Sequence, residues 1–218
     1  MAKLRSALIV TTVALGLATV AAVPSSASSA PAAHPAKAAR AVAAQAALPQ
    51  FLAAREMPAS LTPWSADPVV AGLPEGGAVC APGVVPSQGT RHREFRTELD
   101  TNGTQITTVA RTEADAVRLV DALRKSLAGC GARIERQNPG VDAVSRYHGA
   151  LAVEEGAHVY SLDTADPEVG NADIHLFSVG RDDRTVTYLR WGQMGDLKDA
   201  PLTAFRATTR TAVNKLWS

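Results

Sequence analysis

The chain has 218 residues, of which 46% are hydrophobic and 20% are charged, so it can bury one sizeable core and does not require two. Without Lys3 and Arg5, which belong to the N-terminal segment described next, 20 of the 22 basic residues remain against 21 acidic ones, a formal net charge of −1. This balance excludes a general electrostatic attraction to nucleic acid or to an anionic membrane surface.

Residues 1–30 have the order of a secretory signal peptide. Lys3 and Arg5 precede an apolar run, and the small-residue stretch PSSASSAPAA follows it. Cleavage after Ala27 or Ala30 suits the small residues one and three positions before each cut, so we expect a secreted protein without stable membrane insertion. The alternative is an uncleaved anchor, because about 17 apolar residues lie near the lower limit for a spanning helix.

Residues 31–47 are mostly Ala with scattered Pro, Lys and Arg, and predict a disordered tether because they offer few large apolar side chains. The composition changes at Leu48, and residues 48–218 are predicted to form the folded domain. A short helix is expected at its start, since Pro49 suits a first turn and Pro58 a stop.

Residues 59–88 hold five prolines and four glycines and predict a long loop that must be fastened to the domain. The next segments, residues 93–101 and 104–111, are rich in β-formers and predict a hairpin. Asn102-Gly103 is expected to form its tight turn, because both residues tolerate positive φ. With Thr104 the same pair is formally a glycosylation sequon.

Residues 112–130 predict a long amphipathic helix. Thr112 and Asp115 resemble a capping box, and Gly129 and Gly131 favour an end there. The apolar stripe recurs at helical spacing: Ala116, Val120, Leu123, Leu127 and Cys130.

The remaining sequence predicts four strands and a final helix. Alternation with period two marks ARIERQ, AHVYSLDT, DIHLFSVGRD and RTVTYLRWGQM as strands, with GRDDR as a turn and ADPEVGNA as a longer connection. Pro201 begins an amphipathic helical pattern near the end of the chain. We therefore expect an α+β fold, a single antiparallel sheet built from hairpins, with the helices packed on one face.

The two cysteines are most simply a disulfide in an exported protein. A bond between Cys80 and Cys130 would tie the Pro/Gly-rich loop to the end of the long helix. The alternative is a reactive or metal-binding thiol, which the absence of any Cys-x-x-Cys motif disfavours.

Sequence motifs for catalysis, metals or cofactors are absent. The histidines lack short metal-ligand spacings, and there is no Gly-x-Ser-x-Gly, Gly-x-Gly-x-x-Gly or phosphate-loop motif. We therefore expect no metal, no cofactor and no enzymatic activity, while a dispersed Ser-His-Asp arrangement stays open as a less favoured alternative.

Amphipathic aromatic residues and one arginine gather in the C-terminal half, although the chain is only 5% aromatic. Together they are a candidate ligand-binding cleft, with an apolar wall and few directional groups. The alternative is that Trp191 and the tyrosines close the ends of the core. The candidate residues are Tyr147, His148, Tyr160, Arg190, Trp191 and Gln193, with Met194 beside them.

The order of these segments resembles the PknH-like extracellular sensor domains of actinobacteria. A secreted segment and a short helix precede MPASL, the helix EADAVRLVDALRKSLAGC ends in a cysteine, and AVSRY and paired strands lead to a last helix. The resemblance covers residues 50–217 and implies an antiparallel sheet flanked by helices around a cleft of generally unknown ligand. The kinase sensors usually carry two disulfides, whereas this chain allows one and contains no kinase.

These observations predict a secreted, non-catalytic, sensor-like domain that binds a small molecule or a cell-envelope component in a cleft. The first alternative is an extracellular protein-interaction module, such as an inhibitor or adaptor. The second is a hydrolase with a dispersed site, which requires Ser, His and a carboxylate within hydrogen-bond reach.

Overall fold

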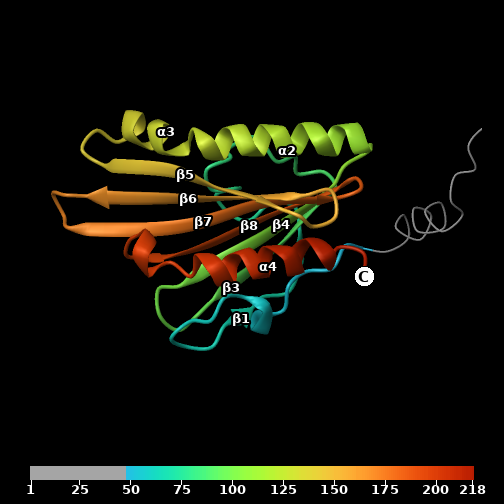
Figure 1. The fold of residues 1–218 in the computed structure, drawn as a ribbon, viewed down its shortest axis with the longest axis horizontal. Helices are drawn as coiled ribbons and strands as arrows, with labels where there is room; N and C mark the ends of the chain where they lie inside the picture. The colour runs from blue at the N-terminus through green and yellow to red at the C-terminus, as the bar shows by residue number, and fades with distance from the viewer. Residues whose placement is uncertain (1–47) are drawn as a thin grey trace, which may run out of the picture.

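A computed structural model describes residues 48–218; the predicted signal peptide and tether, residues 1–47, lie outside the described part. An antiparallel sheet of eight strands has the order β1-β3-β4-β8-β7-β6-β5 (Figure 1). The strand β2 also pairs with β3. The strands are β1 (Ser65–Ala66), β2 (Val70–Ala71), β3 (Thr90–Arg96), β4 (Asn102–Val109), β5 (Asp142–Leu151), β6 (Ala157–Asp166), β7 (Asn171–Asp182) and β8 (Thr185–Met194). The predicted α+β class is confirmed.

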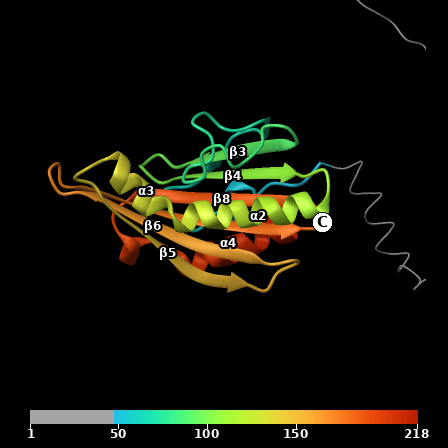
Figure 2. The ribbon, with the colours of Figure 1, turned by 90° about the horizontal axis from the view of Figure 1, so that it is seen from above.

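Helices cover both faces of the sheet, which corrects the predicted one-sided packing (Figures 1 and 2). One face carries α2 (Glu113–Ala128) and α3 (Cys130–Gln137), and the other carries α4 (Leu202–Asn214). The 3-10 helix η1 (Ala54–Glu56) contacts α4, and η2 (Leu197–Asp199) precedes it. In residues 48–218 no helix has both the length and the apolar character needed to span a bilayer.

Two hydrophobic cores result, one on each side of the sheet. The central strands carry apolar side chains at consecutive positions, so both of their faces must be covered. The α2 core includes Ile106, Leu123, Leu127, Tyr160, Phe177, Val179, Val186 and Tyr188. The α4 core includes Leu52, Met57, Phe95, Ile174, Leu176, Leu189, Trp191, Phe205 and Val213.

The predicted hairpin forms, but the prediction that Asn102-Gly103 makes its turn is wrong. Arg96 pairs with Asn102, so the turn spans residues 97–101 and Gly103 lies within β4. A Cβ at Gly103 would come within 2.6 Å of the Met57 methyl carbon, so the glycine admits close packing. The Asn102 side chain donates to the Asp100 carbonyl and accepts from Arg190, so the sequon amide is engaged.

The strand predicted for ARIERQ is wrong, because these residues belong to α3. Gly129 is the C-cap of α2, as predicted, but a second helix, α3, begins directly after it. Gly131 then lies so close to β5 that a Cβ there would be 2.5 Å from the Ala143 carbonyl oxygen. The other three predicted strands and the final helix are confirmed, whereas the predicted N-terminal helix is only the single turn η1.

The predicted disulfide between Cys80 and Cys130 is present, and no free cysteine exists in the described part. Hydrogen bonds also anchor the loop around Cys80. Its carbonyl accepts from Ser126 Oγ at 2.7 Å and from Arg133 at 2.8 Å, and the Tyr188 hydroxyl donates to the neighbouring Val79 carbonyl. The part of the long Pro/Gly-rich segment around Cys80 is thereby fixed over the α2 core, whereas Trp64 and Ala66 at β1 pack against the α4 core.

Candidate ligand-binding cleft

The six residues predicted to line one cleft lie on opposite faces of the sheet. Successive residues of a regular strand point to opposite sides, so Arg190 and Trp191 cannot share a face. The register of β5 shifts after Tyr147, and contacts assign the sides there: Tyr147 lies against Tyr160, whereas His148 bonds Ser161. The α2 side carries Tyr147, Tyr160 and Arg190, whereas the α4 side carries His148, Trp191 and Gln193.

On the α2 side the two tyrosines form an edge cluster. Their ring centroids lie 5.0 Å apart, and the Tyr147 hydroxyl bonds His158 Nδ1 at 2.9 Å. Tyr147 is half exposed at the sheet edge. Trp191, in contrast, is 2% exposed within the α4 core, so it closes the core as the alternative interpretation held.

His148 forms a pair with a serine that the sequence analysis did not single out. Its Nε2 lies 2.8 Å from Ser161 Oγ, and Asp163 on the same strand favours its protonated form electrostatically. Burial nevertheless lowers the pKa of His148, and Arg146 and Arg206 add to this effect. Ser161 is only 1% exposed, so the arrangement offers its hydroxyl to no substrate.

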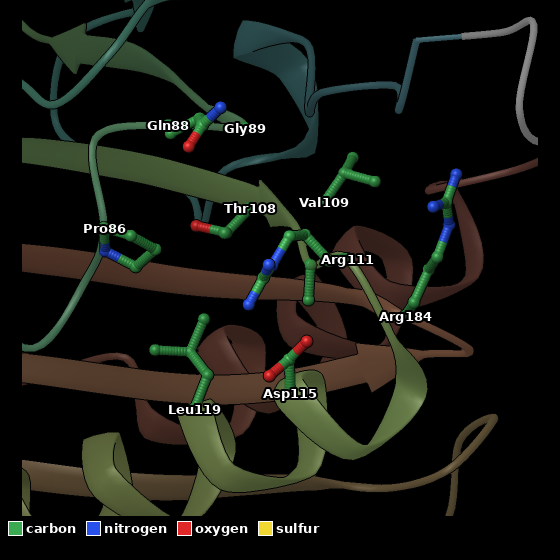
Figure 3. Close-up of a pocket in the computed structure, with 10 residues that line it drawn as sticks. Pro86, Gln88, Gly89, Thr108, Val109, Arg111, Asp115, Leu119 and Arg184 are labelled. Atoms are coloured by element: carbon green, nitrogen blue, oxygen red, sulfur yellow. The ribbon is translucent and has the colours of Figure 1, made fainter. Parts of the chain in front are cut away.

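A cleft of about 430 Å³ lies elsewhere, where β4 ends and α2 begins (Figure 3). It has three walls: the segment 86–89, the end of β4 with the residues that follow, and the first turns of α2. Its lining residues are Pro86, Gln88, Gly89, Thr108, Val109, Ala110, Arg111, Asp115, Leu119 and Arg184.

Local interactions hold the segment 86–89 against β4. Val109 N donates to the Gly89 carbonyl at 2.8 Å, and the hydroxyls of Thr90 and Thr108 are 2.7 Å apart. Gly89 has φ of +75°, and a Cβ there would be 2.6 Å from the Val109 carbonyl oxygen. This wall therefore depends on a glycine at position 89.

The start of α2 is equally fixed. Thr112 caps the helix by accepting from Asp115 N at 3.0 Å, and its hydroxyl donates to the Asp115 carboxylate at 2.8 Å. This hydroxyl hydrogen bond lowers the pKa of Asp115 more than any other interaction does, and the charges of Arg118 and Arg111 contribute. Asp115 is therefore ionised and already engaged at neutral pH.

Two arginines are among the residues that line the cleft. Within residues 48–218 neither the Arg111 nor the Arg184 guanidinium forms a side-chain hydrogen bond or an ion pair. Figure 3 shows the Arg111 guanidinium over the cleft between Thr108 and Leu119, whereas that of Arg184 extends away from it. Arg111 can thus turn its donors toward an anion in the cleft.

The cleft combines these donors with an apolar wall formed by Pro86, Val109 and Leu119. The sequence analysis missed this site, because its residues come from four separate segments. One signal was available: Arg111 is the last residue of a predicted strand and directly precedes the helix cap Thr112, so its long charged side chain is expected to stay outside the core.

No protein-family model and no curated protein matches this chain. Among solved structures, a fragment of a STAR-related lipid transfer protein from Xanthomonas axonopodis is 12% identical over 61% of this chain and 94% of that one, with a TM-score of 0.22. A similarity this low says nothing about the fold or function of this chain. What the cleft binds must follow from its own shape and charge.

Proposed function

We propose that this chain is an exported, non-catalytic sensor-type domain that binds a small amphipathic molecule with an anionic group in the cleft between α2 and β4. One observation carries the proposal: the cavity of about 430 Å³ places an unpaired Arg111 guanidinium beside apolar walls, as judged within residues 48–218. This volume falls in the usual range of small-molecule sites.

Export and a relationship to the PknH-like sensor domains are part of this proposal. The signal-peptide pattern supports export, and the order of segments in the sequence supports the relationship. The disulfide between Cys80 and Cys130 agrees with an oxidising compartment. Mass spectrometry of the protein secreted by the producing cell, with and without reductant, tests both cleavage and the disulfide.

The expected ligand class follows from the two kinds of surface in the cleft. A flexible apolar chain would remove Leu119, Val109 and Pro86 from water, at about 25 cal/mol for each Å² of apolar surface buried. A carboxylate would accept two hydrogen bonds from one guanidinium, which fits the fork of Arg111.

The experiment is calorimetric titration of the purified protein with decanoate, decanol and decyltrimethylammonium. Decanoate is expected to bind most tightly and the cation not at all, because only the carboxylate pairs with Arg111. The Arg111→Gln variant should weaken decanoate binding roughly tenfold. Arg210→Gln, an exposed arginine of α4, is the matched control. Equal affinity in the Arg111→Gln and Arg210→Gln variants contradicts the cleft.

The non-catalytic part of the proposal has its own test. Ser161 and His148 are the pair that most resembles a nucleophile and base in residues 48–218, and burial of Ser161 separates it from substrate. We expect hydrolysis of p-nitrophenyl esters to be the same with the native protein and with a Ser161→Ala variant. A loss of hydrolysis in that variant would support the hydrolase alternative.

A further inference from the structure

A second hollow lies on the α4 side of the sheet, on the face opposite the cleft. Its volume is about 310 Å³. Arg91, Arg93 and Phe95 lie at every second position of β3, so their side chains point to the same face of the sheet. Phe95 belongs to the α4 core, which places the hollow on the α4 side. The lining residues are Leu48, Pro49, Gln50, Phe51, Val69, Arg91, Arg93 and Lys215. Three of these are cations and none is a carboxylate.

The charges in this hollow are only partly compensated. Lys215 Nζ pairs with Glu56 at 2.6 Å, just outside the lining. Arg93 donates to the Leu52 carbonyl at 2.9 Å, but its Nε is buried without a hydrogen-bond partner in the described part of the chain. Arg91 forms no side-chain hydrogen bond or ion pair there. Two guanidinium groups therefore share one side of β3 without a carboxylate.

The spacing of the arginines favours an anion between them. Residues two apart on a strand are about 7 Å apart on the same face, so their positive charges repel unless a negative group neutralises them. A buried Nε–H without an acceptor is also costly, and an anion oxygen would satisfy it. Phe51 and Val69 provide an apolar wall, while the Gln50 side-chain amide already donates to the Ser218 carbonyl.

We propose that this hollow is a second binding site, specific for a phosphomonoester group, with Arg91 and Arg93 as its anion ligands. A phosphomonoester is nearly a dianion at neutral pH and offers three acceptor oxygens, so it matches two guanidinium groups better than a carboxylate does. The group can belong to a soluble sugar phosphate or to a lipid head group. The proposal is independent of the ligand in the cleft.

The test is titration of the purified protein with inorganic phosphate and with a hexose phosphate, followed by ¹H–¹⁵N spectra. Binding is expected to move the amide signals of Gln50, Arg91 and Lys215 and to weaken as salt is added. Arg91→Gln should lower the affinity roughly tenfold or more. Arg210→Gln is the control for loss of charge on the same side. An unchanged affinity in Arg91→Gln, or no binding at millimolar phosphate, overturns the site.

Two further experiments distinguish a lipid phosphomonoester from a soluble one, and the hollow from the cleft. Sedimentation with phosphatidylcholine vesicles, with and without phosphatidic acid, measures whether a lipid phosphomonoester is bound better than the hexose phosphate. The Arg111→Gln variant distinguishes the hollow from the cleft, because it is expected to bind the hexose phosphate normally while its decanoate affinity falls. A parallel loss of both ligands in Arg111→Gln contradicts two separate sites.

Discussion

Gly192, in β8, faces a histidine on the neighbouring strand β7. His175 pairs with Gly192 in the sheet register, and a Cβ at position 192 would lie 2.2 Å from His175 Nδ1 and 3.3 Å from an Arg190 nitrogen. The glycine therefore makes room for two polar side chains. Burial, with a smaller contribution from the charge of Arg190, lowers the pKa of His175 to about 4.

Gly192→Ala is expected to destabilise the protein by about 1–3 kcal/mol, because the new methyl group overlaps the imidazole ring. Urea unfolding measures the change. His175→Ala in the same chain should recover most of the loss, since it removes the atoms that are overlapped. If the double variant is no more stable than Gly192→Ala, the contact with His175 is not the cause.

The low pKa of His175 makes stability depend on pH in a defined window. The unfolded histidine binds its proton near pH 6.5 and the folded one only near pH 4, so the unfolded state holds more protons between these values. The free energy of unfolding should therefore fall as the pH is lowered from 6.5 to 4, by up to about 1.4 kcal/mol per pH unit from this group. NMR titration of the His175 ring should show a midpoint near 4; one near 6.5 contradicts the burial argument.

At the scale of elements, one ion pair connects the start of the domain to the end of α4. Glu56 in η1 accepts from Lys215 Nζ and from Ala53 N, both at 2.6 Å. Burial alone would raise the pKa of Glu56, but these two hydrogen bonds and the charges of Lys215 and Arg55 outweigh it, and the pKa is lowered. The pair therefore stabilises the fold above pH 4.5, and this contribution is lost as the pH falls through the lowered pKa.

Glu56→Gln is expected to lower the stability by about 1 kcal/mol at pH 7, because the pair is only partly exposed. The difference from the native protein should shrink as the pH falls from 4.5 through the lowered pKa of Glu56, because the native carboxylate then also becomes neutral. Thermal unfolding at both pH values measures it. Glu75→Gln, at an exposed position of the long loop, is the control and should change little. A deficit that persists at low pH would rule out the ionic origin.

Helices and strands could be predicted where the sequence pattern that specifies them lies within the element itself. The helix from Glu113 shows its cap and apolar stripe within 16 residues, and the strands β6, β7 and β8 show their alternation within ten or twelve. The turn predicted at Asn102-Gly103 was wrong because turn propensity is a local property, whereas these residues lie in β4 and pair with both β3 and β8. Gly131 was predicted to mark the end of a helix, but it lies within α3. A glycine is needed there because the helix packs closely on β5.

At the scale of the whole molecule, the disulfide connects stability to the cleft. Cys80 lies in the long loop that continues to the segment 86–89, so the bond to Cys130 restrains the segment that forms one cleft wall. The closed loop has a sequence separation of 50 residues, for which chain entropy contributes about 4 kcal/mol.

The double variant Cys80→Ser/Cys130→Ser is therefore expected to lose about 4 kcal/mol of stability. Its decanoate affinity should also fall, because the segment 86–89 is less restrained. Denaturant unfolding and calorimetry measure the two effects, and the native protein in reductant is the matched control. An unfolding midpoint that does not respond to reduction would show that the hydrogen bonds of Cys80 and Val79 hold the loop by themselves.

The sequence alone determined the α+β class, the helices α2 and α4, most strands and the pairing of its two cysteines. These features follow from periodicity, capping and the small number of thiols, which are all properties of short segments or of composition. Only the tertiary structure decided which side of the sheet each helix covers. An amphipathic pattern says that one helix face is buried, but not against which layer.

The positions of the binding sites were also decided only by the tertiary structure. Strand alternation places Arg190 and Trp191 on opposite faces of the sheet. The residues that surround Arg111 in the cleft and Arg91 in the hollow come from segments that are distant in the sequence. Contacts between distant segments depend on how the chain closes upon itself, and no local pattern encodes them.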